Sequence, residues 1–184
     1  MNKLVPFRSL LILGVAGFVG SNLAYRILKT TDAKVHIFDN LSRRGVHHNL
    51  KWLQGVAGNS DRLKVTIGDI RDAALVQRAV QVATEIYHFA AQVAVTTSIA
   101  DPVLDFDVNV RGTLNVLEAA RKGGRRPFLL FTSTNKVRMH GIAARGSWSA
   151  PLQLCRQHRS KRVTTVGSSV SLWLFERSGG PVRA

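Results

Sequence analysis

The sequence predicts a doubly wound α/β fold, because strand-like and helix-like segments alternate along its first 134 residues. Short apolar or β-branched runs recur five times, and segments with helical periodicity separate most of them. A loop patterned in glycine follows the first run and opens the first helical segment. Strands that alternate with helices are joined by βαβ crossovers, so we expect a parallel sheet with helices on both faces.

The elements follow one another in a regular order. The apolar run "SLLILG" at 9–14 predicts a buried strand, and "GFVGSNLAYRILKT" at 17–30 has apolar residues at helical spacing. β-branched and aromatic residues predict four further strands, at 34–40, 63–69, 85–91 and 126–134. Two more helices are expected between these strands, at 72–83 and 103–123.

Composition places the chain among soluble globular proteins. Its 184 residues are 45% hydrophobic and 20% charged, which fits one domain with a sizeable core. The single cysteine, Cys155, excludes an internal disulfide bond and favours a cytoplasmic protein. The apolar opening of the chain leads directly into the glycine loop, so we expect neither a signal peptide nor a membrane-spanning segment.

The net charge of +15 is distributed unevenly along the chain. Residues 1–137 hold 18 Lys and Arg against 10 Asp and Glu, whereas residues 138–184 hold 8 against the single acid Glu176. The basic residues of the second part form no recognised nucleic-acid motif, stacking platform or helical stripe. We therefore do not expect nucleic acid as a partner.

Three glycines, Gly14, Gly17 and Gly20, form a G-x-x-G-x-x-G pattern between the first strand and the first helix. Glycine permits a tight turn and lets the backbone approach a pyrophosphate, whose charge the helix N-terminus meets. Asp39 closes the second strand 25 residues after Gly14, where a carboxylate can accept hydrogen bonds from ribose hydroxyls. These features predict a Rossmann-type site for NAD. Arg43 and the arginine after it leave NADP open, although Asp39 disfavours an additional phosphate.

The blocks "GVAGFVGSNL", "FDNLSRRG", "GDIRD", "HFAAQVAVTTS", "NVRGTLNVLEAAR" and "FTSTNKV" follow one another within residues 9–137. In that order they resemble the extended short-chain dehydrogenase/reductases, the nucleotide-sugar epimerases and dehydratases. The variants "NLSRRG…NLKWL" and "QVAVTTS" are most similar to those of CDP-paratose/CDP-tyvelose 2-epimerases. This resemblance implies tightly held NAD, oxidation of a sugar carbon to a transient ketone, and return of the hydride to the opposite face. It also implies that the substrate is a nucleotide sugar. A homo-oligomer is a possible state of the intact enzyme.

The resemblance assigns roles to matching positions. The glycine loop would cradle the pyrophosphate, the end of the second strand would bind the adenosine ribose, and the next two strand ends would line the adenine and the cofactor path. The expected cofactor-binding residues are Gly14, Gly17, Phe18, Val19, Gly20, Asp39, Asn40, Ser42, Arg43, Asp69, Ile70, Ala90, Ala91, Gln92 and Asn109. Thr134 matches the catalytic Ser/Thr that hydrogen-bonds the reacting sugar oxygen. Leu13, Val15 and Ala16 replace the family's usual Thr-Gly-Gly, and we expect their bulk to narrow the approach of the pyrophosphate.

The family's general acid/base is a tyrosine four residues before a lysine that lowers its pKa. Tyr25 and Lys29 have this spacing, but they lie in the first helical segment, away from the expected nicotinamide. Tyr87 is followed by Ala91, so the required pair is absent from the sequence.

Three histidines have simpler interpretations than catalysis or metal binding. His47 and His48 are adjacent in a predicted loop, where we expect their side chains to diverge, and no metal site is predicted. His88 lies in a predicted buried strand and is expected to be a satisfied core residue.

The sequence leaves the family pattern after Val137, where relatives read Asn-Lys-Val-Tyr-Gly and this chain reads "NKVRMHG". The segment "SLWLFERSGGPVR" at 171–183, read one base further on, permits Pro-Tyr-Gly-Cys-Ser-Lys-Gly-Ala-Ala-Asp-Gln-Tyr-Val. That peptide contains the missing Tyr-x-x-x-Lys pair. We therefore interpret residues 1–137 as an incomplete NAD-binding domain and residues 138–184 as an irregular, frameshifted tail of a truncated and inactive epimerase homologue.

Two other functions stay open. The chain could be a non-catalytic dinucleotide-binding protein whose basic tail recruits an anionic partner, which salt-dependent binding lost on deleting 138–184 would support. Alternatively, the reaction could be dehydration or reduction of another sugar nucleotide.

Overall fold

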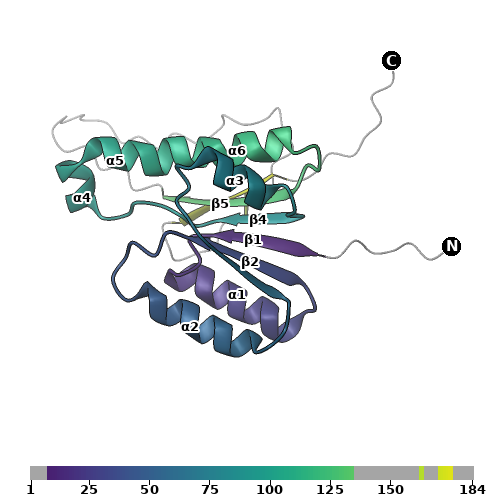
Figure 1. Ribbon diagram of the computed structural model, residues 1–184. Coiled ribbons are helices and arrows are strands. Elements are labelled where there is room, and N and C mark those ends of the chain that lie inside the picture. Colours follow the sequence, from purple (N-terminus) through teal and green to yellow (C-terminus); the bar gives the residue numbers. More distant parts are fainter. Residues whose placement is uncertain (1–7, 135–161, 164–169, 176–184) are drawn as a thin grey trace, which may run out of the picture.

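The computed structural model describes residues 8–134, 162–163 and 170–175, which form one sheet with helices on both faces (Figure 1). The strands are β1 (Ser9–Leu13), β2 (Lys34–Asp39), β3 (Leu63–Ile67), β4 (Glu85–His88), β5 (Phe128–Thr134), β6 (Arg162–Val163) and β7 (Val170–Phe175). The helices are α1 (Phe18–Thr30), α2 (Val46–Ala57), α3 (Ala73–Val80), α4 (Val95–Ala100), α5 (Pro102–Phe106), the π-helical turn η1 (Asp107–Arg111) and α6 (Gly112–Lys122). No helix in these ranges has the length and apolar character needed to cross a membrane.

The strand order is β3-β2-β1-β4-β5-β7-β6, and β1 to β5 are parallel. This confirms the predicted doubly wound sheet. The order reverses between β1 and β4, because the chain first builds outward through β2 and β3 and then returns to the other side of β1. A crevice forms at such a reversal, beyond the carboxyl ends of the strands.

The central strand β1 is buried on both faces, as expected for a parallel strand between two helical layers. Its side chains alternate between the layers. Leu10 and Ile12 pack in the core with residues of α1 and α2, whereas Leu11 and Leu13 pack with residues of α3 and α6. Figure 1 places α1 and α2 on one side of the sheet and α3 and α6 on the other.

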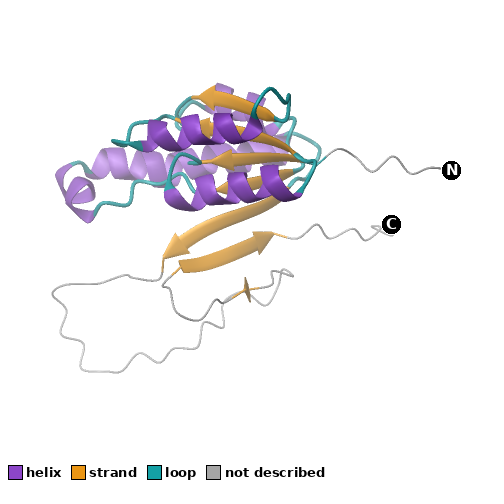
Figure 2. Ribbon diagram, turned by 90° about the horizontal axis from the view of Figure 1, so that it is seen from below, coloured by secondary structure: helices purple, strands orange, loops and turns teal. Residues whose placement is uncertain are grey.

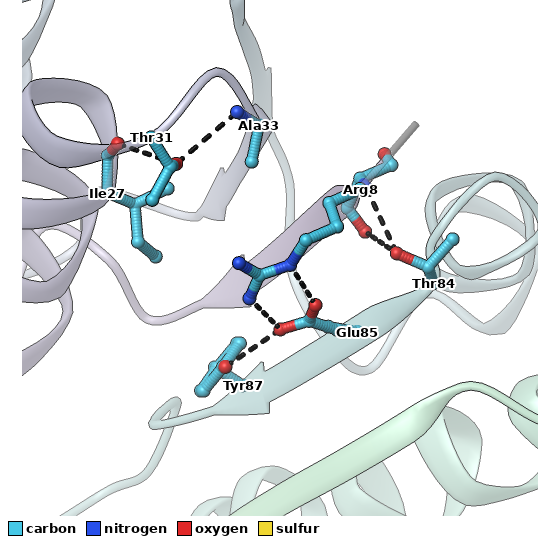
Figure 3. Close-up of polar contacts among 8 residues, drawn as sticks. Arg8, Ile27, Thr31, Ala33, Thr84, Glu85 and Tyr87 are labelled. Atoms are coloured by element: carbon cyan, nitrogen blue, oxygen red, sulfur yellow. Dashed lines mark hydrogen bonds and ion pairs between the residues drawn. The ribbon is translucent and has the colours of Figure 1, made fainter. Parts of the chain in front are cut away.

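Local side-chain contacts define where the helices begin and end. The Asp72 carboxylate accepts a hydrogen bond from the Leu75 N–H at 3.0 Å and caps α3. Asp101 caps α5 in the same way, and Pro102 occupies the first helical turn. At the end of α1, the Thr31 hydroxyl donates to the Ile27 carbonyl at 2.9 Å (Figure 3).

The helix predicted at 103–123 consists of three consecutive pieces, α5, η1 and α6, with π-type bonding at Asp107–Arg111. Two helices are not predicted from the sequence: α2, whose N-cap is Gly45 at a φ of 85°, and the six-residue α4. A left-handed glycine just before α2 makes the segment resemble a loop.

Two pieces of the segment 138–184 fall within the described residues, and both are strands that the sequence does not predict. β7 pairs antiparallel with β5, from Leu129–Phe175 to Thr134–Val170, and β6 pairs with β7 (Figure 2). The apolar run "VSLWLF" suits a strand, and the edge of β5 offers it unpaired backbone groups. The expectation of an irregular tail otherwise concerns residues outside the described ranges.

Candidate functional site

A cavity of about 290 Å³ opens at the carboxyl ends of β1 to β4, where the strand order reverses. The predicted residues that line it are Gly14, Gly17, Asp39, Asn40, Ser42, Arg43, Asp69, Ile70, Ala90, Ala91 and Gln92. The lining residues that were not predicted from the sequence are Phe38, Val46, Gly68, Arg71, Phe89, Val93, Leu104 and Val108. The topology therefore brings together eleven of the fifteen predicted cofactor-binding residues, from four separate blocks of sequence.

Two of the three loop glycines are required by the packing of the protein itself. Gly14 has a φ of 78°, and a Cβ there would lie 2.5 Å from the Ala90 nitrogen. At Gly20 a Cβ would lie 2.6 Å from the Val15 Cα. Gly17 differs, because the nearest atom to its Cβ would be the Gly14 carbonyl oxygen at 3.5 Å. Gly14 and Gly17 line the cavity, whereas Gly20 lets α1 approach the loop.

The larger side chains in the loop do not narrow the cavity, contrary to the sequence-based expectation. Leu13, Val15 and Ala16 are each fully buried, and none of them lines the cavity. Their bulk belongs to the hydrophobic core, where Leu13 packs on one face of the sheet and Val15 on the other. The loop therefore presents backbone and glycine to the cavity.

The carboxylate of Asp39 holds two backbone segments at the mouth of the cavity. One oxygen accepts from the Ala16 N–H at 2.9 Å, and the other accepts from the Leu41 N–H at 2.8 Å. Leu41 has a φ of 54°, so the second bond helps to stabilise a left-handed residue. On the other side of the loop, the Asn49 side-chain amide donates to the Ala16 carbonyl at 2.7 Å.

The Asp69 carboxylate forms a charged cluster on the neighbouring wall of the cavity, after β3. It accepts hydrogen bonds from the Arg71 guanidinium at 2.8 and 2.9 Å and from the Asn40 amide at 3.1 Å. The hydrogen bonds from Arg71 lower the pKa of Asp69 to about 2. From α6, the Asn115 amide donates to the Ile70 and Arg71 carbonyls at 2.9 and 3.1 Å. This wall is thus fixed in place and carries a permanent anion beside a cation.

Asn109 supports the third wall without lining the cavity. Its side-chain oxygen accepts from the Gln92 N–H at 2.9 Å, and its nitrogen donates to the Gln92 carbonyl at 3.0 Å. The same nitrogen donates to Asp105 at 3.1 Å, and Asp105 also accepts from the Ser98 hydroxyl at 2.6 Å. Asn109 lies in the π-helical turn, a distortion often found at functional sites.

Several predicted residues lie outside the cavity lining. Phe18 and Val19, at the start of α1, are 82% and 57% exposed beside the loop. Thr134 is the last residue of β5 and pairs with Val170, but its side chain lies outside the described part. Its catalytic role stays a prediction, and so do the cofactor contacts of all the predicted residues, including Phe18, Val19 and Gly20.

Both tyrosines are engaged away from the cavity. The Tyr25 ring stacks on Trp52 of α2 with ring centroids 4.9 Å apart. Tyr87 donates its hydroxyl to Glu85 at 2.9 Å, and Arg8 holds the same carboxylate at 2.6 and 3.0 Å (Figure 3). Burial, together with the hydrogen bond to Glu85, raises the pKa of Tyr87 to about 12. A tyrosine whose pKa is raised, and whose hydroxyl is bound to Glu85 at the start of β4, is unsuited to acid–base chemistry in the cavity.

The histidines differ in part from expectation. His47 and His48 lie in the first turn of α2, with ring centroids 4.0 Å apart, so the predicted loop and diverging side chains are wrong. His88 is 1% exposed, and its Nε2 lies 3.0 Å from the Thr113 hydroxyl oxygen. Its Nδ1 has no hydrogen-bond partner among the described residues, so only one of the two ring nitrogens is satisfied.

The parallel sheet and the cavity at its strand-order reversal define a Rossmann-type α/β protein. The chain belongs to the family described as GDP-mannose 4,6 dehydratase, whose model matches residues 11–142. This match confirms the resemblance to the extended short-chain dehydrogenase/reductases.

Individual relatives agree with this assignment. The chain is 45% identical over 130 residues to CDP-paratose 2-epimerase of Salmonella typhi, covering 70% of this chain and 37% of the relative. It is 33% identical over 153 residues to dTDP-glucose 4,6-dehydratase of Streptomyces antibioticus, covering 80% and 43%. The solved UDP-glucose 4-epimerase of Thermus thermophilus, a complex with NAD, is 36% identical with a TM-score of 0.51, covering 63% and 34%. The chain therefore spans less than half the length of each.

Proposed function

We propose that this chain carries the NAD-binding part of a nucleotide-sugar epimerase of the CDP-paratose/CDP-tyvelose 2-epimerase type. The observation that carries the proposal is the convergence of Gly14, Asp39 and Asp69 on one cavity at the ends of three neighbouring parallel strands. The 45% identity to a CDP-paratose 2-epimerase supports the choice of reaction, in which hydride leaves a sugar carbon and returns to it.

The residues present fit NAD. Gly17 lines the cavity and forms the N-cap of α1, so it presents bare backbone at a helix N-terminus that a pyrophosphate can approach. Asp39 offers carboxylate oxygens for ribose hydroxyls, while Ile70 gives an apolar contact for adenine. Ala90, Ala91 and Gln92 would line the path toward the nicotinamide. Bound NAD would supply the hydride acceptor.

The second part of the proposal is that the 184-residue chain does not turn over substrate. Thr134 would hydrogen-bond the reacting sugar oxygen, but no Tyr-x-x-x-Lys pair stands in a position to move its proton. General acid–base assistance is worth about 10²–10⁴ in rate, and loss of positioning lowers the rate further. We infer that the change of sequence after Val137 reflects a shifted reading frame.

Calorimetric titration with NAD tests the cofactor assignment. The unmodified chain should bind NAD weakly, and Asp39→Ala should lose about 1–3 kcal/mol of binding free energy through the ribose hydroxyls and the loosened loop. Asp61→Ala is a matched control, because this carboxylate is 84% exposed and precedes the amino end of β3, whereas the cavity lies at the carboxyl ends of the strands. Equal affinity of all three proteins would remove Asp39 from the site.

Restoring the reading frame after codon 137 tests the reaction. A gene extended in the restored frame to its natural stop should encode the Tyr-x-x-x-Lys pair. Its protein product should epimerise CDP-sugars, whereas the present chain should show no measurable turnover. Changing the restored tyrosine to phenylalanine should abolish turnover and leave NAD binding intact. A restored protein that contains the pair and binds NAD, yet acts on no nucleotide sugar, would disprove the epimerase assignment while sparing the fold.

The same assay covers a second candidate reaction. The 33% identical dTDP-glucose 4,6-dehydratase favours dehydration of a sugar nucleotide as the alternative. Conversion of dTDP-glucose by the restored protein, without epimerisation of CDP-sugars, would establish that alternative.

A further inference from the structure

We infer that Asn49 of α2 is a positioning residue for the pyrophosphate of NAD and acts through the glycine loop. The inference rests on the NAD binding proposed above. The Asn49 Nδ2 donates to the carbonyl of Ala16, 33 residues earlier in the chain, at 2.7 Å. Ala16 is part of the glycine loop and is fully buried, so its peptide lies where the loop contacts α2. Asn49 begins the block "NLKWL" of the family-like variant quoted above, but the sequence gives it no role, because that role follows from a contact between distant segments.

The geometry of the peptide bond transmits the effect of this contact to the cavity. The Ala16 carbonyl and the Gly17 N–H belong to one planar peptide unit, and in a trans peptide these groups point in opposite directions. When Asn49 holds the carbonyl, it therefore directs the Gly17 N–H away from α2. Gly17 lines the cavity and forms the N-cap of α1, the position at which backbone N–H groups bind an anion.

A second side chain fixes the preceding peptide unit. Asp39 accepts the Ala16 N–H at 2.9 Å, which orients the Val15–Ala16 peptide in the same manner. Two consecutive peptide planes of the loop are thus held by side chains from β2 and α2. A loop held in this way keeps its donors in place before the ligand arrives, and such preorganisation increases affinity. Asp39 also faces the cavity itself, whereas Asn49 does not line it and acts only through Ala16.

The choice of ligand separates this role from general stabilisation of α2. Adenosine has no phosphate and would occupy the wall formed by Ile70 and its neighbours. ADP and NAD carry a pyrophosphate that would contact the loop. A residue that positions the loop should affect ADP and NAD and leave adenosine unchanged, whereas loss of structure should weaken all three.

The experiment compares Asn49→Ala and Asn49→Asp with the unmodified chain and with Gln54→Ala. Gln54 is an exposed amide on the same helix and serves as the matched control. Affinities for NAD and ADP come from calorimetry, and affinity for adenosine comes from NMR titration. Asn49→Ala should weaken NAD and ADP about 3–10-fold, the loss expected for one hydrogen bond. Asn49→Asp, nearly isosteric but unable to donate, should weaken them at least as much, while adenosine and Gln54→Ala stay within about twofold of the unmodified chain.

The alternative outcomes are distinct. Unchanged NAD and ADP affinity in both Asn49 variants would overturn the inference and leave the proposed function standing. An equal loss for adenosine and ADP in Asn49→Asp would also overturn it, because the effect would then be structural. An unmodified chain that binds neither NAD nor ADP would overturn the proposed function and the inference together.

Discussion

The side-chain amide of Asn109 brackets the backbone of Gln92, accepting its N–H at 2.9 Å and donating to its carbonyl at 3.0 Å. Asp105 defines the orientation of this amide. An ionised carboxylate only accepts hydrogen bonds, so the Asn109 nitrogen must face Asp105 and its oxygen must face the Gln92 N–H. The π-helical turn thereby fixes a wall of the cavity that lies 17 residues earlier in the chain.

Replacing Asn109 with alanine should therefore loosen the segment after β4. We expect the free energy of unfolding to fall by about 1–3 kcal/mol, because the partly buried Gln92 groups lose their partner. NAD affinity should fall as well. Urea denaturation and calorimetry measure the two effects, with the exposed Gln77→Ala of α3 as control. Equal stability of Asn109→Ala and Gln77→Ala would mean that the hydrogen bonds between Asn109 and the Gln92 backbone contribute nothing to stability.

Two glycine-to-alanine changes should alter the stability of the fold in opposite directions. Gly14→Ala should destabilise the fold by about 2–5 kcal/mol, because a left-handed φ and a clash with the Ala90 backbone add together. Gly55→Ala should stabilise it by about 0.5–1 kcal/mol, since Gly55 lies within α2 and a Cβ there meets nothing within 4 Å. Thermal melts of both variants test the pair. A stable Gly14→Ala protein would contradict the described loop geometry.

Two buried histidines should make stability depend on pH. Burial lowers the pKa of both His36 and His88 to about 4, against about 6.5 in the unfolded chain. The unfolded state then binds more protons between these values, so their contribution is complete above about pH 6.5 and is lost as pH falls toward 4. Each histidine should add a slope of up to about 1.4 kcal/mol per pH unit. Urea denaturation from pH 7 to 4.5 measures the slope.

A single substitution separates this effect from general acid unfolding. His88→Gln keeps an amide donor for the Thr113 hydroxyl but does not titrate, so it should flatten the slope by the share of one histidine. A slope equal to that of the unmodified chain would show that His88 is not the titrating group.

Removal of the Arg71 cation should change the pKa of its partner Asp69. Arg71→Gln should raise the pKa of Asp69 from about 2 toward its ordinary value, because Arg71 supplies the main stabilising hydrogen bonds. Because the pKa of Asp69 is lower in the folded state, the Asp69–Arg71 pair contributes stability above the ordinary value of about 3.9. That contribution is lost as pH falls toward 2. Arg71 is 41% exposed, so the change in stability at pH 7 should be only about 0–1 kcal/mol.

Carboxyl NMR titration measures this pKa directly. Arg78→Gln on the exposed face of α3 is the control and should leave the titration of Asp69 unchanged. An Asp69 that still titrates near 2 in Arg71→Gln would assign the lowered pKa to Asn40 and the backbone instead.

The five parallel strands were predictable because the first is a short apolar run, "SLLILG", and the other four are rich in β-branched and aromatic residues. α2 was missed because its segment begins with a left-handed glycine and two polar histidines, and its buried contacts are few. The π-helical turn was missed because the hydrophobic spacing across 103–123 suits an ordinary helix equally well. β7 depends on the open edge of β5, which is a tertiary property and leaves no periodic signal.

The sequence placed residues at the cavity correctly where they lie at the end of a strand, while their contacts with a cofactor stay predictions. Asp39 is the last residue of β2 and Asp69 lies two residues after β3, and parallel strands bring such residues to one edge of the sheet. Arg71 was missed although it lies in the quoted block "GDIRD", because a charged residue two positions later gives no sign of returning to Asp69. Asn49 was missed for a different reason. Its contact depends on the packing of α2 against the loop, which periodicity cannot supply.

Within the described part of the chain, every residue that lines the cavity lies between Gly14 and Val108, ahead of β5. A ribosome that reaches the codons of β5 has therefore already synthesised the whole lining. The change of frame proposed above at codon 137 would alter none of these residues, so the gene would lose its chemistry and keep the lining of the cavity. A cell that expresses such a chain would carry a protein that withdraws dinucleotide from the free pool without consuming it.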